Sequence, residues 1–97
     1  MTEDRLERLR IVITGRVQGV GYRWWFQNRA MEIGLTGWVR NRTNGAVEAE
    51  IQGTPDQLET LIRSAWQGSP LAKVILIDRN SIGTVDGETG FSRRNTV

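Results

Sequence analysis

Apolar residues change from a strand pattern to a helix pattern across a glycine-rich segment early in the chain. Residues 9–14 form a short run rich in β-branched side chains, which predicts a strand buried on both faces. Residues 15–23 follow with the sequence GRVQGVGYR, and residues 22–33 then carry apolar side chains at helical spacing. Gly34 is placed to end that helix. The sequence therefore predicts a strand joined through a glycine loop to the start of a helix.

Two further strands are expected immediately after this helix. Residues 35–42 and 46–51 are separated by Asn44-Gly45, the residue pair that favours a tight hairpin turn. In the second of these strands apolar residues alternate with Glu48 and Glu50. Because alternate side chains point to opposite faces of a sheet, the two glutamates are predicted to lie on a solvated face.

A second helix begins with a complete set of start signals. Thr54 is the capping residue, Pro55 occupies the first helical position, and Gln57 completes a capping box. Its expected apolar stripe comprises Leu58, Leu61, Ile62, Ala65 and Trp66. Residues 71–77 predict a fourth strand, and a weak fifth strand is expected around Phe91. With right-handed crossovers, this order predicts an antiparallel sheet with both helices on one face.

Composition limits the chemistry available to the chain. The 97 residues include no cysteine and no histidine, which excludes disulfides and thiol catalysis and removes the commonest general base and metal ligand. No apolar run approaches the ~20 residues that a membrane-spanning helix needs. Residues 1–10 lack the apolar core of a secretory signal. We therefore expect a single domain over residues 1–97 in the cytoplasm, with residues 1–7 and 81–90 flexible.

The glycine loop has the composition of an anion-binding site. Glycines let backbone N–H groups approach a ligand, and the following helix start adds unpaired donors and the positive end of the helix dipole. Arg23 falls in the first helical turn, where its guanidinium can close such a cradle around a tetrahedral anion. A second polar patch follows at residues 37–41, with the sequence GWVRN.

These two stretches resemble the signature motifs of the acylphosphatase family. The residues matching the first motif are Gly15, Val17, Gln18, Gly19, Val20 and Arg23. Those matching the second are Gly37, Trp38, Val39, Arg40, Asn41, Gly45, Val47 and Gly53. The resemblance extends from about residue 9 to residue 74 and weakens toward the end of the chain. It implies an α+β, ferredoxin-like β-α-β-β-α-β sandwich that hydrolyses the carboxyl-phosphate bond of small acyl phosphates.

The resemblance also assigns roles that the residue types can perform. Arg23 is the expected phosphoryl ligand, because two-pronged arginine–phosphate contacts are strong. Asn41 is expected to place the attacking water, since its amide offers both an acceptor and donors. The backbone donors of the cradle would come from Gln18, Gly19, Val20, Gly21 and Tyr22. No metal and no cofactor are implied, and we expect a monomer that binds neither nucleic acid nor membrane.

Other interpretations remain open from the sequence alone. The same element order builds RNA-recognition modules, although these need exposed aromatic residues on their strands. A regulatory phosphate-binding domain is a further alternative. Separately, Arg23 could be an ordinary surface residue in an ion pair, and Asn41 could bond to nearby backbone without a role in catalysis. Of the four tryptophans, Trp24 is expected to be exposed and the other three are expected to lie in the core.

Overall fold

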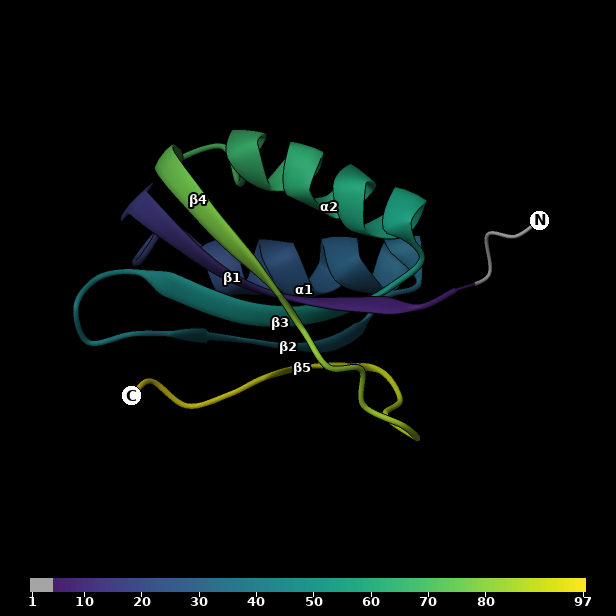
Figure 1. The fold of residues 1–97 in the computed structure, drawn as a ribbon. Coiled ribbons are helices and arrows are strands. Elements are labelled where there is room, and N and C mark those ends of the chain that lie inside the picture. Colours follow the sequence, from purple (N-terminus) through teal and green to yellow (C-terminus); the bar gives the residue numbers. More distant parts are fainter. Residues whose placement is uncertain (1–4) are drawn as a thin grey trace.

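Two helices pack side by side on one face of a five-stranded sheet in the computed structural model, which describes residues 5–97 (Figure 1). This arrangement confirms the predicted ferredoxin-like α+β fold with both helices on one face. The elements are β1 (Glu7–Arg16), α1 (Tyr22–Ile33), β2 (Thr36–Asn41), β3 (Val47–Gly53), α2 (Pro55–Gln67), β4 (Lys73–Ile82) and β5 (Phe91–Arg93).

The strand order is β4-β1-β3-β2-β5, and the first four strands pair antiparallel as predicted. β5 differs, because it runs parallel to β2 and makes the sheet mixed. The reason is the connection between β4 and β5, which stays at one end of the sheet while crossing to the opposite edge. β5 must then run opposite to β4, which is the direction of β2 (Figure 1).

Several predicted boundaries shift when the strands pair. β4 continues to Ile82, so it includes two residues that were expected to belong to the flexible loop. β1 begins at Glu7, the last residue of the segment expected to be flexible, and residues 1–4 of that segment lie outside the described residues. The remaining loop is tied to the sheet, since Val85 exchanges two hydrogen bonds with the side chain of Gln52.

Local signals define both helices. α1 spans the predicted residues and ends at Gly34, whose φ of 97° is the left-handed conformation that glycine adopts readily. α2 begins with the predicted capping box, in which Thr54 accepts from the Gln57 N–H and the Gln57 side chain accepts from the Thr54 N–H. These end contacts satisfy backbone groups that a bare helix leaves unpaired.

The hydrophobic core lies between the helices and the sheet. β1 contributes Leu9, Ile11 and Ile13 to it, while the alternate residues Arg10 and Thr14 point to the opposite face and are partly or fully exposed. The prediction that β1 is buried on both faces is therefore wrong, because the helices cover only one face. The largest fully buried side chains include Tyr22, Phe26, Ile51, Leu58 and Leu61.

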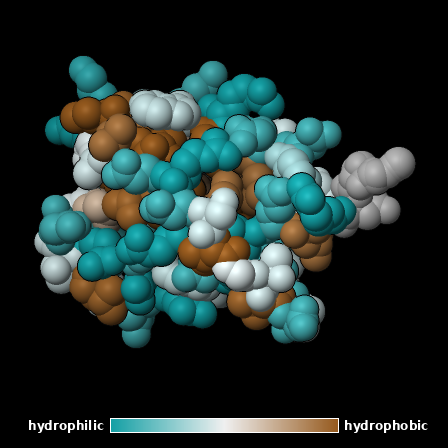
Figure 2. Space-filling model, viewed as in Figure 1, coloured by the Kyte–Doolittle hydropathy of each residue, from teal (hydrophilic) through white to brown (hydrophobic). Residues whose placement is uncertain are grey.

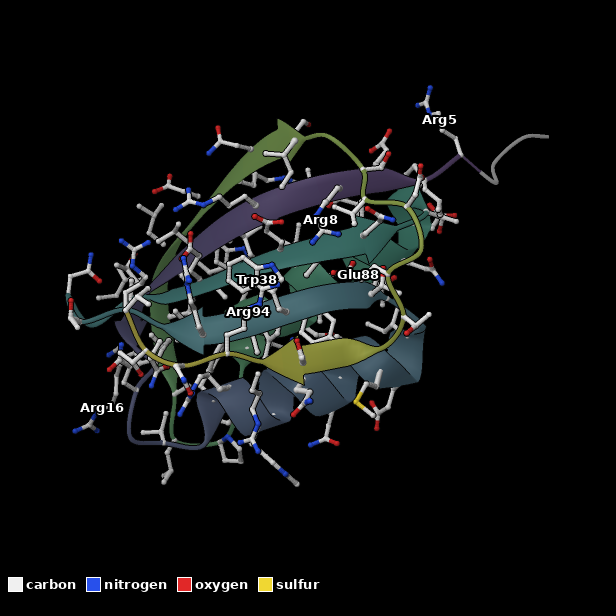
Figure 3. All side chains as sticks on the ribbon, turned by 90° about the horizontal axis from the view of Figure 1, so that it is seen from below. Arg5, Arg8, Arg16, Trp38, Glu88 and Arg94 are labelled. Carbon is white, nitrogen blue, oxygen red and sulfur yellow. The ribbon has the colours of Figure 1, made fainter. Side chains whose placement is uncertain are left out.

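The sheet face away from the helices carries a network of charged residues (Figure 3). Glu48 is buried there, with only 3% of its side chain exposed, and accepts hydrogen bonds from Arg10 at 2.6 Å, Arg40 at 2.8 Å and Arg42 at 3.0 Å. Its predicted place on a solvated face is therefore wrong. Glu50 is partly exposed and accepts from Arg8 at 2.9 Å.

Trp38 is buried on the same face, with two guanidinium groups close to its ring. The guanidinium carbons of Arg40 and Arg94 lie 4.8 and 4.5 Å from the ring centroid. Contacts of this length are favourable cation–π interactions. Because Arg94 follows β5, the contact also ties the end of the chain to the sheet.

Trp66 is the exception among the tryptophans expected in the core. It is 46% exposed near the end of α2 and is not among the buried residues of that helix. Exposed apolar residues also occur along the β4 edge, including Ile75 and Leu71. Figure 2 shows hydrophobic residues on this side interspersed with hydrophilic ones rather than gathered into one patch.

Candidate active site

The segment between β1 and α1 forms a tight loop because its glycines adopt conformations that other residues avoid. Gly19 and Gly21 have φ values of 73° and 76°, and a Cβ atom on either would meet nothing within 4 Å. At Gly15 a Cβ atom would collide with the carbonyl group of Lys73, so the backbones of β1 and β4 can approach closely only without a side chain. The loop is thus shaped by backbone conformation and is open on its outer side.

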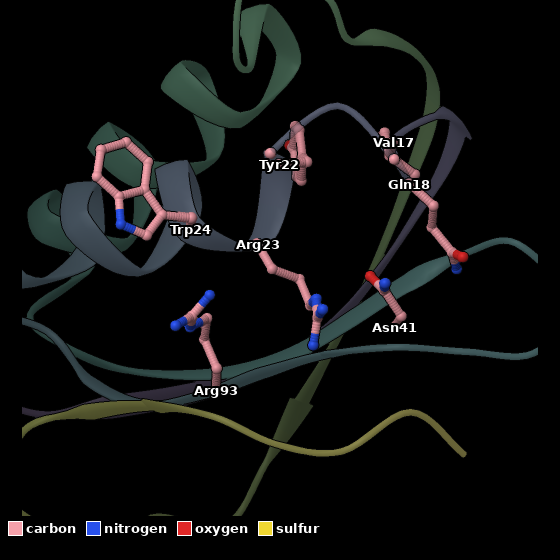
Figure 4. Close-up of a pocket in the computed structure, with 9 residues that line it drawn as sticks. Val17, Gln18, Tyr22, Arg23, Trp24, Asn41 and Arg93 are labelled. Carbon is pink, nitrogen blue, oxygen red and sulfur yellow. The ribbon is translucent and has the colours of Figure 1, made fainter.

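A pocket of about 180 Å³ lies where this loop, the start of α1 and the ends of β2 and β5 meet (Figure 4). Its lining residues are Val17, Gln18, Gly19 and Gly21 from the loop, Tyr22, Arg23 and Trp24 from α1, Asn41 from β2 and Arg93 from β5. The structure therefore brings the loop, Arg23 and Asn41 into one cavity, although residues 23 and 41 come from different elements.

Arg23 directs its guanidinium into the pocket toward Asn41 (Figure 4). Its one hydrogen bond within residues 5–97 is long, with Nη1 3.4 Å from the carbonyl oxygen of Arg94. Among these residues it makes no salt bridge. The surface ion pair considered from the sequence is therefore not present in the described chain, and most of the donors of Arg23 are available to an anion.

Asn41 has a buried side-chain oxygen that accepts no hydrogen bond in the described chain. Across residues 5–97, its Oδ1 is the only buried side-chain nitrogen or oxygen without a hydrogen-bond partner. Burying an acceptor without a partner costs about 1–3 kcal/mol. This unpartnered acceptor belongs to a residue that lines the pocket together with Arg23.

Gln18 holds the loop against the β2–β3 hairpin. Its Nε2 donates to the carbonyl oxygens of Arg42 at 2.8 Å and Ala46 at 2.9 Å. On the other side of the loop, the hydroxyl of Ser69 donates to the carbonyl of Val20 at 3.1 Å. The loop is therefore held at two points by side chains of the protein itself.

The start of α1 faces the pocket with its backbone donors available. In the described chain no side chain caps this helix at Gly21. The side chain of Tyr22 turns away, and its hydroxyl donates to the carbonyl oxygen of Ala65 at 2.7 Å in the core. Burial raises the pKa of Tyr22 above its ordinary range. Val20 does not line the pocket and packs against the core instead.

Arg93 is a site residue that sequence reasoning missed. It lies two residues after Phe91 on β5, so both side chains point to the helix side of the sheet, and Arg93 reaches the rim of the pocket. The only available signal was the period of two along a strand, and the uncertain pairing of β5 obscured it. Arg23 and Arg93 give the pocket two positive charges, and no acidic residue of the described chain lines it.

Residues 5–97 contain neither a cluster of metal-ligating side chains nor a membrane-spanning helix. No three histidine, cysteine, aspartate or glutamate side chains lie together in a group that could hold a metal ion. Neither helix of this part of the chain combines the length and the apolar character required to cross a membrane.

Comparisons with known proteins identify the family of this chain. The acylphosphatase family matches residues 9–93. An acylphosphatase from Rhizorhabdus wittichii is 44% identical over 94 residues, which is 97% of this chain and 93% of that protein. An acylphosphatase from Thermococcus kodakarensis is 49% identical over 71 residues, covering 73% of this chain and 78% of that protein. The crystal structure of acylphosphatase from Bacillus subtilis superposes with a TM-score of 0.87 at 37% identity, covering 93% of this chain and 99% of that one. The chain therefore belongs to the acylphosphatase family of enzymes.

Proposed function

We propose that this chain hydrolyses small acyl phosphates to a carboxylate and inorganic phosphate, using an arginine–backbone cradle and a water positioned by Asn41. The observation that carries the proposal is the unpartnered Oδ1 of Asn41 in the same pocket as the free guanidinium of Arg23. One residue supplies a cation for the phosphoryl group, and the other supplies an acceptor for water. The chemistry requires these two functions together.

Arg23 and the loop would bind the phosphoryl oxygens. Charge-assisted hydrogen bonds from a guanidinium are about twice as strong as neutral ones. The uncapped N–H groups at the start of α1 add donors and the positive end of the helix dipole. Because the loop is braced by Gln18 and Ser69, these donors need no rearrangement when charge redistributes in the transition state.

Asn41 would hold the attacking water through its free Oδ1. The water oxygen forms a new bond to phosphorus, the bond from phosphorus to the acyl oxygen breaks, and its electron pair leaves with the carboxylate. The proton of the water passes to a phosphoryl oxygen of the substrate. The leaving carboxyl group has a pKa of about 4, so it departs without an acid catalyst. Positioning and electrostatics are then sufficient for the reaction.

The test is the hydrolysis of acetyl phosphate by the purified protein with excess chelator present. Arg23→Ala is expected to lower kcat/KM by about 10²–10³, the usual cost of losing a preorganised donor. Arg63→Ala is the matched control, since Arg63 is an exposed arginine on α2 outside the pocket. Turnover that survives in Arg23→Ala, or that requires an added metal, would contradict the proposed mechanism.

Asn41→Ala separates water placement from phosphate binding. We expect it to lower kcat about 10²-fold, while inorganic phosphate still inhibits at nearly the same concentration. Asn80→Ala is the control, because Asn80 is an exposed asparagine on β4. A collapse of phosphate affinity with kcat unchanged would instead identify Asn41 as a ligand of the phosphoryl group.

The proposal also specifies a small-molecule partner. An RNA-recognition sheet stacks bases on exposed aromatic rings. Trp38 is not exposed in this way, because it is buried and the guanidinium groups of Arg40 and Arg94 lie over its ring. We further propose that the protein acts as a cytoplasmic monomer without a metal. Sedimentation in the presence and absence of a single-stranded oligonucleotide tests both the oligomeric state and the exclusion of nucleic acid.

A further inference from the structure

Trp24 is a large apolar side chain left in solvent beside the proposed phosphate ligand. It follows Arg23 in the first turn of α1 and is 61% exposed. Its backbone carbonyl accepts a hydrogen bond from the side chain of Asn28 at 2.8 Å. The exposed ring therefore has no evident role in the core.

Trp24 is also the residue shared by two neighbouring cavities. It lines the pocket that contains Arg23 and Asn41, and it lines a second hollow of about 350 Å³ on the outer surface of α1. The second hollow continues along the helix past Trp25, Asn28, Arg29 and Glu32. In Figure 4, Asn41 and Trp24 lie at opposite ends of the pocket, with Arg23 and Arg93 between them.

The charged residues of the second hollow already have partners. Arg29 donates to Glu32 at 3.2 Å and to the hydroxyl of Ser64 at 3.2 Å. The neighbouring ring of Trp25 is itself fixed, because it packs against Tyr22 with ring centroids 5.5 Å apart. The hollow is thus lined by two indole rings and by charged side chains that already have partners. It therefore suits an apolar group better than a charged one.

We propose that this hollow is the acyl subsite and that the preferred substrates are acyl phosphates with an aromatic or bulky apolar acyl group. The inference rests on the proposed function. In an acyl phosphate the acyl carbon is separated from phosphorus by a single oxygen. A phosphoryl group held by Arg23 and the loop therefore brings the acyl group to the end of the pocket that Trp24 lines, and the ring can pack against it.

Kinetics with two substrates test the subsite. Wild-type protein is expected to hydrolyse benzoyl phosphate with a higher kcat/KM than acetyl phosphate. In Trp24→Ala the ratio of these two constants should fall about ten-fold, while Trp24→Phe, which keeps an aromatic face, should lower it at most about three-fold. Trp66→Ala removes another exposed tryptophan, on α2 and outside both hollows, and should leave the ratio unchanged. An unchanged ratio in Trp24→Ala would overturn the proposal.

Binding of phosphonates separates this inference from the proposed activity. Benzylphosphonate and methylphosphonate carry the same anionic group and cannot be hydrolysed as acyl phosphates. Calorimetry should show that the wild type binds benzylphosphonate more tightly than methylphosphonate. In Trp24→Ala the ratio of the two affinities should fall about ten-fold. If the wild type hydrolyses neither acyl phosphate yet shows this pattern, the proposed function fails and the apolar subsite stands. Equal affinities of the wild type for the two phosphonates would refute the subsite whatever the activity.

Discussion

Replacing Glu48 with glutamine tests whether a buried carboxylate on the sheet, outside the proposed active-site pocket, stabilises the fold. The substitution keeps the shape of the side chain and removes its charge. In the native protein this carboxylate accepts from Arg10, Arg40 and Arg42 at 2.6–3.0 Å and is almost fully buried. A glutamine can accept with only one oxygen, and its NH₂ group would face a guanidinium that is also a donor.

The expected loss in the free energy of unfolding is about 3 kcal/mol. Removing one partner of a buried ion pair costs roughly 3–5 kcal/mol, because the remaining charge is left without compensation. The three arginine side chains are 25–37% exposed, so water partly solvates them after the change. This exposure places the expectation at the lower end of the range. For a domain of this size, such a loss lowers Tm by roughly 12–15 °C.

The stabilising effect of Glu48 is expected to depend on pH. Burial alone raises the pKa of Glu48, but the hydrogen bonds from Arg40, Arg10 and Arg42 outweigh it and hold the pKa below its ordinary value. A depressed pKa stabilises the fold above the pKa of the unfolded chain, and that contribution is lost as pH falls through the folded value. Urea denaturation should therefore show the full difference between wild type and Glu48→Gln at pH 7 and a shrinking difference below pH ~4.

A surface pair supplies the matched control. Glu59 pairs with Arg79, but both side chains are about half exposed, so Glu59→Gln should cost less than about 1 kcal/mol. If Glu48→Gln costs no more than Glu59→Gln at pH 7, the three arginines are adequately solvated without their carboxylate. The reasoning from burial would then be refuted.

Three further substitutions address the loop and the rim of the pocket. Gly15→Ala places a Cβ atom on the carbonyl of Lys73 at a φ of 128°, so urea denaturation should show a loss of about 3 kcal/mol, and a loss below about 1 kcal/mol would contradict the close approach. Gln18→Ala removes two hydrogen bonds that brace the loop, and kcat/KM should fall about ten-fold; unchanged kinetics would mean that the loop keeps its shape unaided. Arg93→Ala should raise the KM for acetyl phosphate about ten-fold with Tm nearly unchanged, whereas an unaltered KM would remove Arg93 from the binding site.

Features coded within a few neighbouring residues could be predicted from the sequence. The bounds of α1, the capping box of α2 and the left-handed Gly34 all depend on residues within one or two helical turns. The prediction that Arg23 and Asn41 share one site could not be made from local pattern, and it came from the resemblance of two motifs to those of a known family. The structure adds the geometry of that convergence, including the free acceptor of Asn41.

Features that depend on strand pairing could not be predicted in the same way. The burial of Glu48 results from arginines on β1 and β2 that become its neighbours only when both strands pair with β3. Alternation along one strand identifies the face of a residue but not what covers that face. Arg93 was missed for a related reason, because its position depends on the parallel pairing of β5 with β2.

The parallel pairing of β5 also determines when Arg93 lines the pocket. β5 contains three residues, and its contacts are fewer than those of the long strands, so it is a part of the sheet that local unfolding opens at low cost. A phosphate ion bound to Arg93 would stabilise only the paired form of β5 and would therefore oppose this opening. Amide hydrogens of β5 should then exchange more slowly in phosphate than in chloride, so hydrogen exchange at one edge of the sheet would report occupancy of the pocket.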